Sequence, residues 1–207
     1  MPTLQVKKGD TKKLPPGDAY TVGVGWDPAA DQSESPDLDV WVIRRYDDGR
    51  SEPIFWGNQD WHRPDLGTNS EGNPWVATPE EDVVYQGDDR TGASSATGYD
   101  EITTLTPSKA PAGLTQYAVF VTYYDDPEVD PPTKTLGMAS NITCGVKNEV
   151  TGNELATNLE GDHAFDVTVL ICTIDRAADG SWSMTAKQEG YTDSMIKVAK
   201  ALGVDFG

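Results

Sequence analysis

Hydrophobic and polar residues alternate along most of the chain with the period of two that is typical of β-strands. Strand-like runs are expected at residues 20–26, 38–46, 83–85, 101–106, 116–124, 138–146, 165–174 and 181–187. The run at 116–124 is apolar on both faces, which predicts a central strand. The Asp-Gly pair at 179–180 predicts a hairpin turn between the last two strands. Many short strands at close spacing favour a two-sheet β-sandwich.

One segment, residues 193–203, follows a helical period instead. Apolar residues from Met195 to Leu202 recur there at the spacing of a single helix face. Asp193 is a candidate N-cap, and Gly203 can end the helix. The chain has 207 residues, which is a usual length for one domain. We therefore expect a single domain over 1–207, dominated by β-structure and closed by a C-terminal helix that packs on a sheet.

Residues 47–81 break the strand pattern. They carry Trp56, Trp61 and Trp75 among several prolines and glycines. The segment is too long for an ordinary connection, so we expect a long loop or an insertion. Two interpretations of its tryptophans stay open. They can form a small core that holds the segment down, or they can anchor an interface with a partner.

The chain is strongly acidic, with 16 Lys and Arg against 34 Asp and Glu and a net charge of −18. This balance excludes nucleic-acid binding as the main function. Asp outnumbers Glu by 23 to 11, and Asp suits turns and metal sites better than helix surfaces. No apolar run is long enough to span a membrane, and the lysine-rich first residues lack the apolar region of a secretory signal. We expect a cytoplasmic protein without membrane insertion.

The sequence lacks the common catalytic motifs. It contains no phosphate-binding loop, dinucleotide fingerprint, zinc-ligand spacing or nucleophile elbow. His62 and His163 have no convincing set of catalytic partners in the sequence. Cys144 and Cys172 lie in strand-like runs, so we expect both to be buried free thiols. The chain is therefore not expected to be an enzyme.

Acidic residues gather in three short motifs. Asp27 follows Gly25-Trp26, and Asp37 and Asp39 flank Leu38 at a strand entrance. The third motif is a Gly- and Asp-rich loop at 87–101 that closes on a strand. Calcium takes six to eight hard oxygen ligands, and crowded carboxylates repel one another without a cation. Turn and capping roles are the alternative for these aspartates. For the loop at 87–101 we favour a divalent cation.

Taken in order, these motifs resemble those of the TerD family of tellurium-resistance and stress-response proteins. The resemblance is carried by Asp27, by Asp37 with Asp39, and by Tyr85–Gly92 with Asp100–Ile102. Later stretches agree in order at 119–124, 136–141, 148–155 and 179–182. The resemblance covers about residues 17–191. It implies a β-sandwich that binds calcium in Asp-rich loops at one end, in a family of cytosolic bacterial proteins with no clear enzyme among them.

The resemblance also implies a ligand set. Matched residue by residue, the expected metal positions are Asp27, Asp37, Asp39, Asp88, Asp89, Gly98, Asp100 and Glu101, for one or two Ca²⁺ ions. The chain departs from the family at Thr97 and Tyr99, which stand where the family has carboxylates. Because calcium affinity rises with the number of anionic ligands, the two replacements are expected to weaken binding.

The sequence therefore predicts a calcium-binding, non-enzymatic stress-response protein of the tellurium-resistance type. We expect it to act by ion-dependent binding or assembly, with a protein partner or with copies of itself. The alternative is a carbohydrate- or surface-binding β-sandwich module that stacks its ligand on the loop tryptophans.

Overall fold

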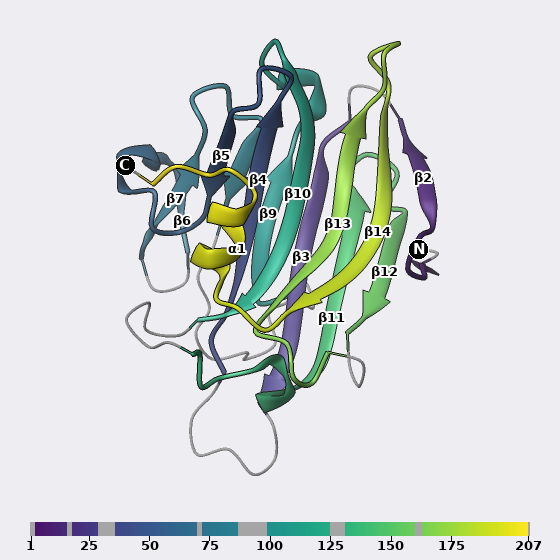
Figure 1. Cartoon of the computed structure of the whole chain (residues 1–207). Helices are drawn as coiled ribbons and strands as arrows, with labels where there is room; N and C mark the ends of the chain where they lie inside the picture. The colour runs from purple at the N-terminus through teal and green to yellow at the C-terminus, as the bar shows by residue number, and fades with distance from the viewer. Residues whose placement is uncertain are drawn as a thin grey trace.

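Two β-sheets pack face to face in the computed structural model, which describes residues 3–15, 18–28, 36–69, 72–86, 99–124, 131–159 and 163–206. Figure 1 shows the two layers, with the one α-helix of the described residues lying in front of the sheet that contains β4 and β10. The arrangement confirms the expected β-sandwich with a helix near its C-terminus.

The first sheet, called sheet A, has eight described strands in the order β1-β12-β11-β3-β9-β8-β7-β6. Their bounds are β1 Thr3–Gln5, β12 Glu154–Asn158, β11 Ala139–Asn148, β3 Tyr20–Pro28, β9 Glu101–Leu105, β8 Val83–Tyr85, β7 Pro74–Ala77 and β6 His62–Thr68. Strand β1 runs parallel to β12, and the other neighbouring strands are antiparallel. Strands β3 and β9, which carry acidic motifs, are neighbours in this sheet.

The second sheet, called sheet B, has six described strands in the order β2-β14-β13-β10-β4-β5, all antiparallel. Their bounds are β2 Thr11–Leu14, β14 Trp182–Tyr191, β13 Thr168–Arg176, β10 Leu114–Tyr123, β4 Leu38–Tyr46 and β5 Ser51–Ile54. Strand β10 lies between β13 and β4, which confirms the central strand expected from its two apolar faces. The predicted Asp-Gly turn joins β13 and β14, with Gly180 at a φ of +81°.

The alternation along β4 explains how both faces of sheet B are buried. Leu38, Val40 and Val42 point into the core between the sheets. Trp41 and Ile43 point to the opposite face, where they pack under helix α1 (Met195–Ala201). The N-cap is Ser194 and not the expected Asp193, so the helix is shorter than the predicted 193–203, and Gly203 with positive φ follows its C-cap as expected. Helix α1 therefore closes the outer face of sheet B.

Short 3₁₀ turns and free thiols complete the described structure. The turns are η1 Gln59–Trp61, η2 Pro107–Lys109 and η3 Leu136–Met138.

Among the described helices, none is both long and apolar enough to cross a membrane. Cys144 and Cys172 are buried and free, as the sequence predicts. Burial raises the pKa of the Cys172 thiol to about 12.

The segment at 47–81 corrects the expectation of a long loop. It forms β5, η1, β6 and β7, and the last two extend the edge of sheet A. Its strands are short and interrupted by proline and glycine, so the period of two does not stand out in the sequence. Trp56 and Trp61 pack against the main core, and the Trp75 ring covers Gly67 so closely that a Cβ there would lie 2.7 Å from it. These contacts agree with the small-core interpretation of the tryptophans.

A buried polar network joins the two sheets at one end. The Arg44 guanidinium on β4 pairs with Asp82 at 2.8 Å, and only 3% of Arg44 and none of Asp82 is exposed. Asp82 precedes β8 in sheet A and also accepts hydrogen bonds from the hydroxyls of Thr78 and Tyr117, at 2.6 and 2.8 Å. Arg44 bonds further to Glu52 at 2.6 Å. Arg44 and Asp82 each lie beside an opposite charge, and this compensation allows the two side chains to be buried.

Candidate functional site

The third acidic motif closes against the end of β3. The main-chain N–H of Asp100 donates to the carbonyl of Val24 at 2.8 Å. One carboxylate oxygen of Asp100 accepts the main-chain N–H of Trp26 at 2.9 Å, and the residue is only 9% exposed. Just before the acidic segment 87–98, the main-chain N–H of Gln86 donates to the carbonyl of Ile102 at 2.8 Å. The segment therefore leaves and re-enters sheet A at neighbouring points.

Trp26 connects this motif with the second one. Its indole Nε1–H donates to the carbonyl of Pro36 at 2.9 Å, while its ring is buried in the main core. The next residue, Asp37, accepts the main-chain N–H of Tyr124 through its carbonyl at 2.8 Å. One tryptophan thus fixes Asp100 with its backbone and the entrance of β4 with its side chain.

Glu101 points in a different direction from the other acidic residues. It is fully buried and shares the inward face of β9 with Leu105. Its carboxylate accepts a hydrogen bond from the Tyr85 hydroxyl, which also lies inside the sandwich. Glu101 therefore presents its carboxyl group to the interior of the sandwich, directly after Asp100 in the chain.

Asp27 points outward from sheet A. Its carboxylate accepts a hydrogen bond from the Asn141 side-chain amide at 2.7 Å. Asn141 sits at an irregularity in the register between β11 and β3, with a φ of +54°. The exposed Asp27 side chain is thus directed toward β11 and away from the inward face that holds Glu101.

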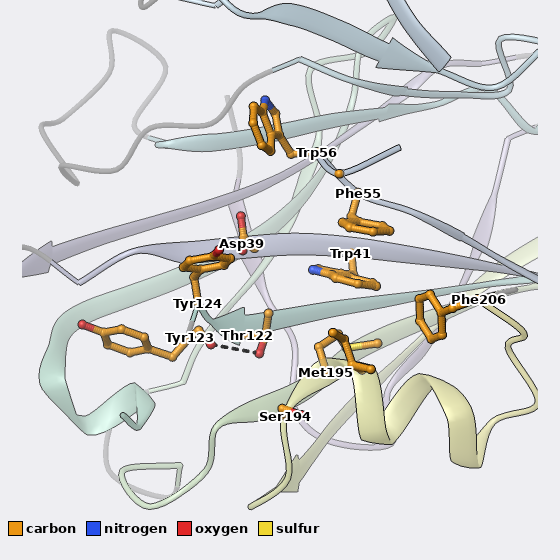
Figure 2. A pocket seen from close by; sticks show the side chains of 12 residues that line it. Asp39, Trp41, Phe55, Trp56, Thr122, Tyr123, Tyr124, Ser194, Met195 and Phe206 are labelled. Atoms are coloured by element: carbon orange, nitrogen blue, oxygen red, sulfur yellow. Dashed lines mark hydrogen bonds between the residues drawn. The ribbon is translucent and has the colours of Figure 1, made fainter. Parts of the chain in front are cut away.

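Asp39 lies on the outer face of sheet B. It is half-buried, follows the same strand face as Trp41, and pairs in register with Thr122 of β10. Figure 2 shows its carboxylate on β4, along the strand from Trp41 and near Tyr124. The structure thus directs Asp39 to a pocket of aromatic residues.

The expected ligand set is only partly within the described residues, because Asp88, Asp89 and Gly98 lie outside them. Among the described acidic, histidine and cysteine side chains, no group of three or more is arranged to hold a metal ion. The structure gathers the Asp100–Glu101 pair and the entrance of β4 around Trp26. It does not unite the described members of the set, Asp27 and Asp39 included, in one cluster.

Tyr99, which stands where the resemblance leads us to expect a carboxylate, has a packing role that sequence reasoning missed. Its ring lies across two glycines of neighbouring strands, Gly23 of β3 and Gly145 of β11. A Cβ at Gly23 would lie 2.3 Å from the ring. The hydroxyl of Tyr99 donates to the carboxylate of Glu154 on β12. Burial, reinforced by Glu154, raises the pKa of Tyr99 well above its usual range. Glycines inside strands are a signal of such close approach.

A pocket of about 310 Å³ opens on the outer face of sheet B. Its described lining includes Asp39, Trp41, Phe55, Tyr124, Met195 and Phe206 (Figure 2). The rings of Trp41 and Phe55 stack with centroids 3.7 Å apart and planes 6° from parallel. Sequence reasoning assigned Trp41 to a strand face and did not find this pocket, because its members come from four distant segments.

The fold and the acidic strand ends together define an acidic two-sheet β-sandwich protein. The family model described as the TerD domain matches residues 3–202, so the chain belongs to the TerD family. The match confirms the resemblance found in the acidic motifs.

The similar proteins agree with this assignment. The chain is 24% identical over 200 residues to the tellurium resistance protein TerD of Serratia marcescens, covering 94% of this chain and 92% of that protein. Two solved structures each superpose with a TM-score of 0.68 at 16% identity over 91% of this chain. One is a protein of unknown function, 98% covered, and the other is a homologue of the telluride resistance protein TerD from Streptomyces coelicolor A3(2), 99% covered. At this identity the two structures support the fold alone.

Proposed function

We propose that this chain is a calcium-binding, non-enzymatic stress-response protein of the tellurium-resistance type that acts by ion-dependent binding or assembly. Membership of the TerD family supports the stress-response role. The relative from Serratia marcescens, which carries tellurium resistance in its name, supports the type of stress. The cytoplasmic location expected from the sequence stays a prediction.

The observation that carries the calcium proposal is the buried Asp100–Glu101 pair. Two carboxylates at consecutive positions, one 9% exposed and one fully buried, are costly to bury unless positive charge compensates them. The Trp26 N–H donates to Asp100 and the Tyr85 hydroxyl donates to Glu101, and a divalent cation beside Asp100 would add positive charge to these neutral donors. Calcium would supply that compensation with the oxygen ligands it prefers.

The donor chemistry of the acidic segment fits such an ion. Asp100 would hold it together with Asp88 and Asp89, and the backbone carbonyl of Gly98 would add a neutral oxygen. Trp26 would keep Asp100 in place whether or not the ion is bound, because its main-chain N–H is part of β3. Calcium binding would then join the acidic segment to the sheet end and complete a surface for a partner or a second copy.

Calorimetric titration of chelator-treated protein with calcium tests the proposal, with mass measured by light scattering before and after. The variant Asp100→Asn keeps an oxygen for the Trp26 N–H but removes the charge. Asp179→Asn, at the exposed turn between β13 and β14, makes the same change far along the chain. We expect binding in the parent and in Asp179→Asn, and clearly weaker binding in Asp100→Asn. An absence of calcium binding in the parent would overturn the proposal, and binding without a change in mass would overturn assembly.

The alternative of a carbohydrate-binding module depends on tryptophans presented to a ligand. Trp56 and Trp61 instead pack against the main core, and Trp75 covers Gly67. Trp61 and Trp75 are therefore engaged within the fold, whereas Trp56 also lines the pocket on the outer face of sheet B. The described contacts therefore favour the calcium proposal over this alternative.

A further inference from the structure

We infer that the sandwich holds a site for one soft divalent metal ion, bound by the sulfur atoms of Cys144, Cys172 and Met184. The three side chains line one small cavity between the two sheets. Cys144 comes from β11 of sheet A, and Cys172 and Met184 come from β13 and β14 of sheet B. The inference goes beyond calcium binding and does not depend on it.

An irregularity in strand pairing turns Cys172 toward the core. Its neighbour Ile171 already lies in the main core, so strict alternation along β13 would direct Cys172 outward. The pairing of β13 with β14 shifts between Leu170 and Cys172, and Cys172 lies in the main core as well. Bulges commonly re-aim a side chain in this way. Cys172 then pairs with Ala186, two residues from Met184 on the buried face of β14.

Cys144 faces these residues from the other sheet. Both cysteines are free, and neither they nor Met184 are more than 2% exposed. Burial, and after it the neighbouring Cys172, raises the pKa of the Cys144 thiol well above its usual range. The influence of one thiol on the other agrees with their place on one cavity. Both thiols therefore keep their protons until a metal ion displaces them.

The cavity has room for one ion and little else. Its volume is about 10 Å³, at the lower limit of the roughly 10–15 Å³ that one water molecule needs. An organic ligand or a hydrated ion is therefore too large. Apart from the three sulfur residues, the lining is aliphatic or glycine except for Thr157, whose hydroxyl already accepts a hydrogen bond from the Gln188 amide.

The sulfur ligands and the charge balance select the kind of ion. Thiolate and thioether sulfurs favour soft metal ions, whereas calcium takes oxygen ligands. Two thiolates balance the charge of a divalent ion, so the complex is neutral in an apolar cavity, where an uncompensated charge would be costly. Each thiol releases its proton to the solvent as its sulfur binds, so two protons leave for each ion bound.

The N-terminal residues close the side of the sandwich where the cavity lies. Val6, between β1 and β2, is part of the lining, and its main-chain N–H donates to the carbonyl of Ala156 at 2.9 Å. Figure 1 shows β2 and the N-terminus beside β14 and β12 at this side. Because β1 and β2 are short edge strands, local opening there gives an ion a path that leaves the central strands paired.

Titration of the reduced protein with Cd²⁺ at saturating Ca²⁺ tests the inference. The signal is the ultraviolet charge-transfer absorption of cadmium–thiolate bonds, which carboxylate ligands do not give. We expect one Cd²⁺ per chain and a higher melting temperature, because the ion binds the folded protein. The protein is also refolded from urea with Cd²⁺ present, so that slow entry is not mistaken for the absence of a site.

Four variants separate the ligands from their surroundings. Cys144→Ala and Cys172→Ala should each weaken Cd²⁺ binding at least about tenfold, since even groups that only support a metal ligand contribute about 10–100-fold. Met184→Leu keeps the volume of the side chain but removes the thioether, and should weaken binding about threefold. Met138→Leu is the matched control and should bind like the parent, because Met138 packs on the same core but does not line the cavity.

Melting in EDTA first confirms that each variant is folded. No charge-transfer band in the parent after refolding with Cd²⁺, or an unchanged affinity in either cysteine variant, would overturn the inference. Equal affinity of the parent and Met184→Leu would overturn the three-sulfur site. Because the band reports sulfur ligands alone, its absence is distinct from a failure of calcium binding at Asp100.

Discussion

The main-chain N–H of Trp26 donates a hydrogen bond of 2.9 Å to the carboxylate of Asp100, 74 residues further along the chain. This bond ties the end of the acidic segment to β3, while the Trp26 indole is bound to the carbonyl of Pro36. The entrance of β4 and the start of β9 therefore depend on the same residue. Any ion held by Asp100 would be positioned by a strand of the sandwich and not by a free-standing loop.

Removing the acceptor at Asp100 is expected to destabilise the calcium-free protein. Asp100→Ala leaves the Trp26 N–H buried without this partner, which should lower the free energy of unfolding by about 1–3 kcal/mol. Asp100→Asn retains an acceptor oxygen and should cost clearly less. Urea unfolding of both variants in EDTA measures the difference. Equal stabilities would show that this hydrogen bond does not support the fold.

Because the Tyr99 ring lies against Gly23, we expect substitutions at these two positions to be strongly coupled in their effect on the free energy of unfolding. Gly23→Ala would place a Cβ 2.3 Å from the Tyr99 ring, so we expect a loss of about 1–3 kcal/mol or more from overpacking. In a background of Tyr99→Ala the same change should cost much less. A double-mutant cycle measured by urea unfolding gives the coupling between the two positions. Additive effects would contradict the packing of Tyr99 on Gly23.

Breaking the buried pair between Arg44 and Asp82 should be among the most damaging changes. Arg44→Met leaves the fully buried Asp82 carboxylate without its cation, at an expected cost of about 3–5 kcal/mol. The double variant Arg44→Met with Asp82→Asn removes both charges and should recover part of the loss. Arg45→Met, one residue along and exposed, is the matched control. Thermal and urea unfolding compare the parent with Arg44→Met, with the double variant and with Arg45→Met.

Buried tyrosines predict a loss of stability in alkali. Burial raises the pKa of Tyr20 to about 12, and burial together with Asp82 raises the pKa of Tyr117 well above its usual range. In the unfolded chain a tyrosine loses its proton near pH 10. The folded state therefore binds more protons above about pH 10, and stability falls as pH rises further. Tyr117→Phe should flatten this fall in urea unfolding across pH 9 to about 11. An unchanged slope would contradict the role of Tyr117.

The strands of the sandwich could largely be predicted from the sequence, because inward residues of β4 and β10 alternate with outward ones. The C-terminal helix could be predicted from its apolar face and its final glycine. Strands β1, β2, β5, β6, β7 and β12 were missed, because they are short, polar or interrupted by proline. Their structure depends on neighbouring strands, which local periodicity does not reveal.

The candidate site was only partly predictable for the same reason. The acidic motifs identify Asp100 and Glu101, but the sequence does not say that one faces Trp26 and the other the sandwich interior. The ring of Tyr99 reaches Gly23 and Gly145 across two strands, and no local signal joins these three positions. The aromatic pocket likewise arises only when β4, β10 and α1 come together.

Calcium-dependent stabilisation tests the central claim most directly. The melting temperature of chelator-treated protein is measured with EDTA and with saturating calcium, in the parent, in Asp100→Asn and in Asp179→Asn. A ligand that binds only the folded state raises the melting temperature. We predict a rise in the parent and in Asp179→Asn, and most of that rise lost in Asp100→Asn. No rise in the parent, or an equal rise in all three proteins, would contradict calcium binding at Asp100.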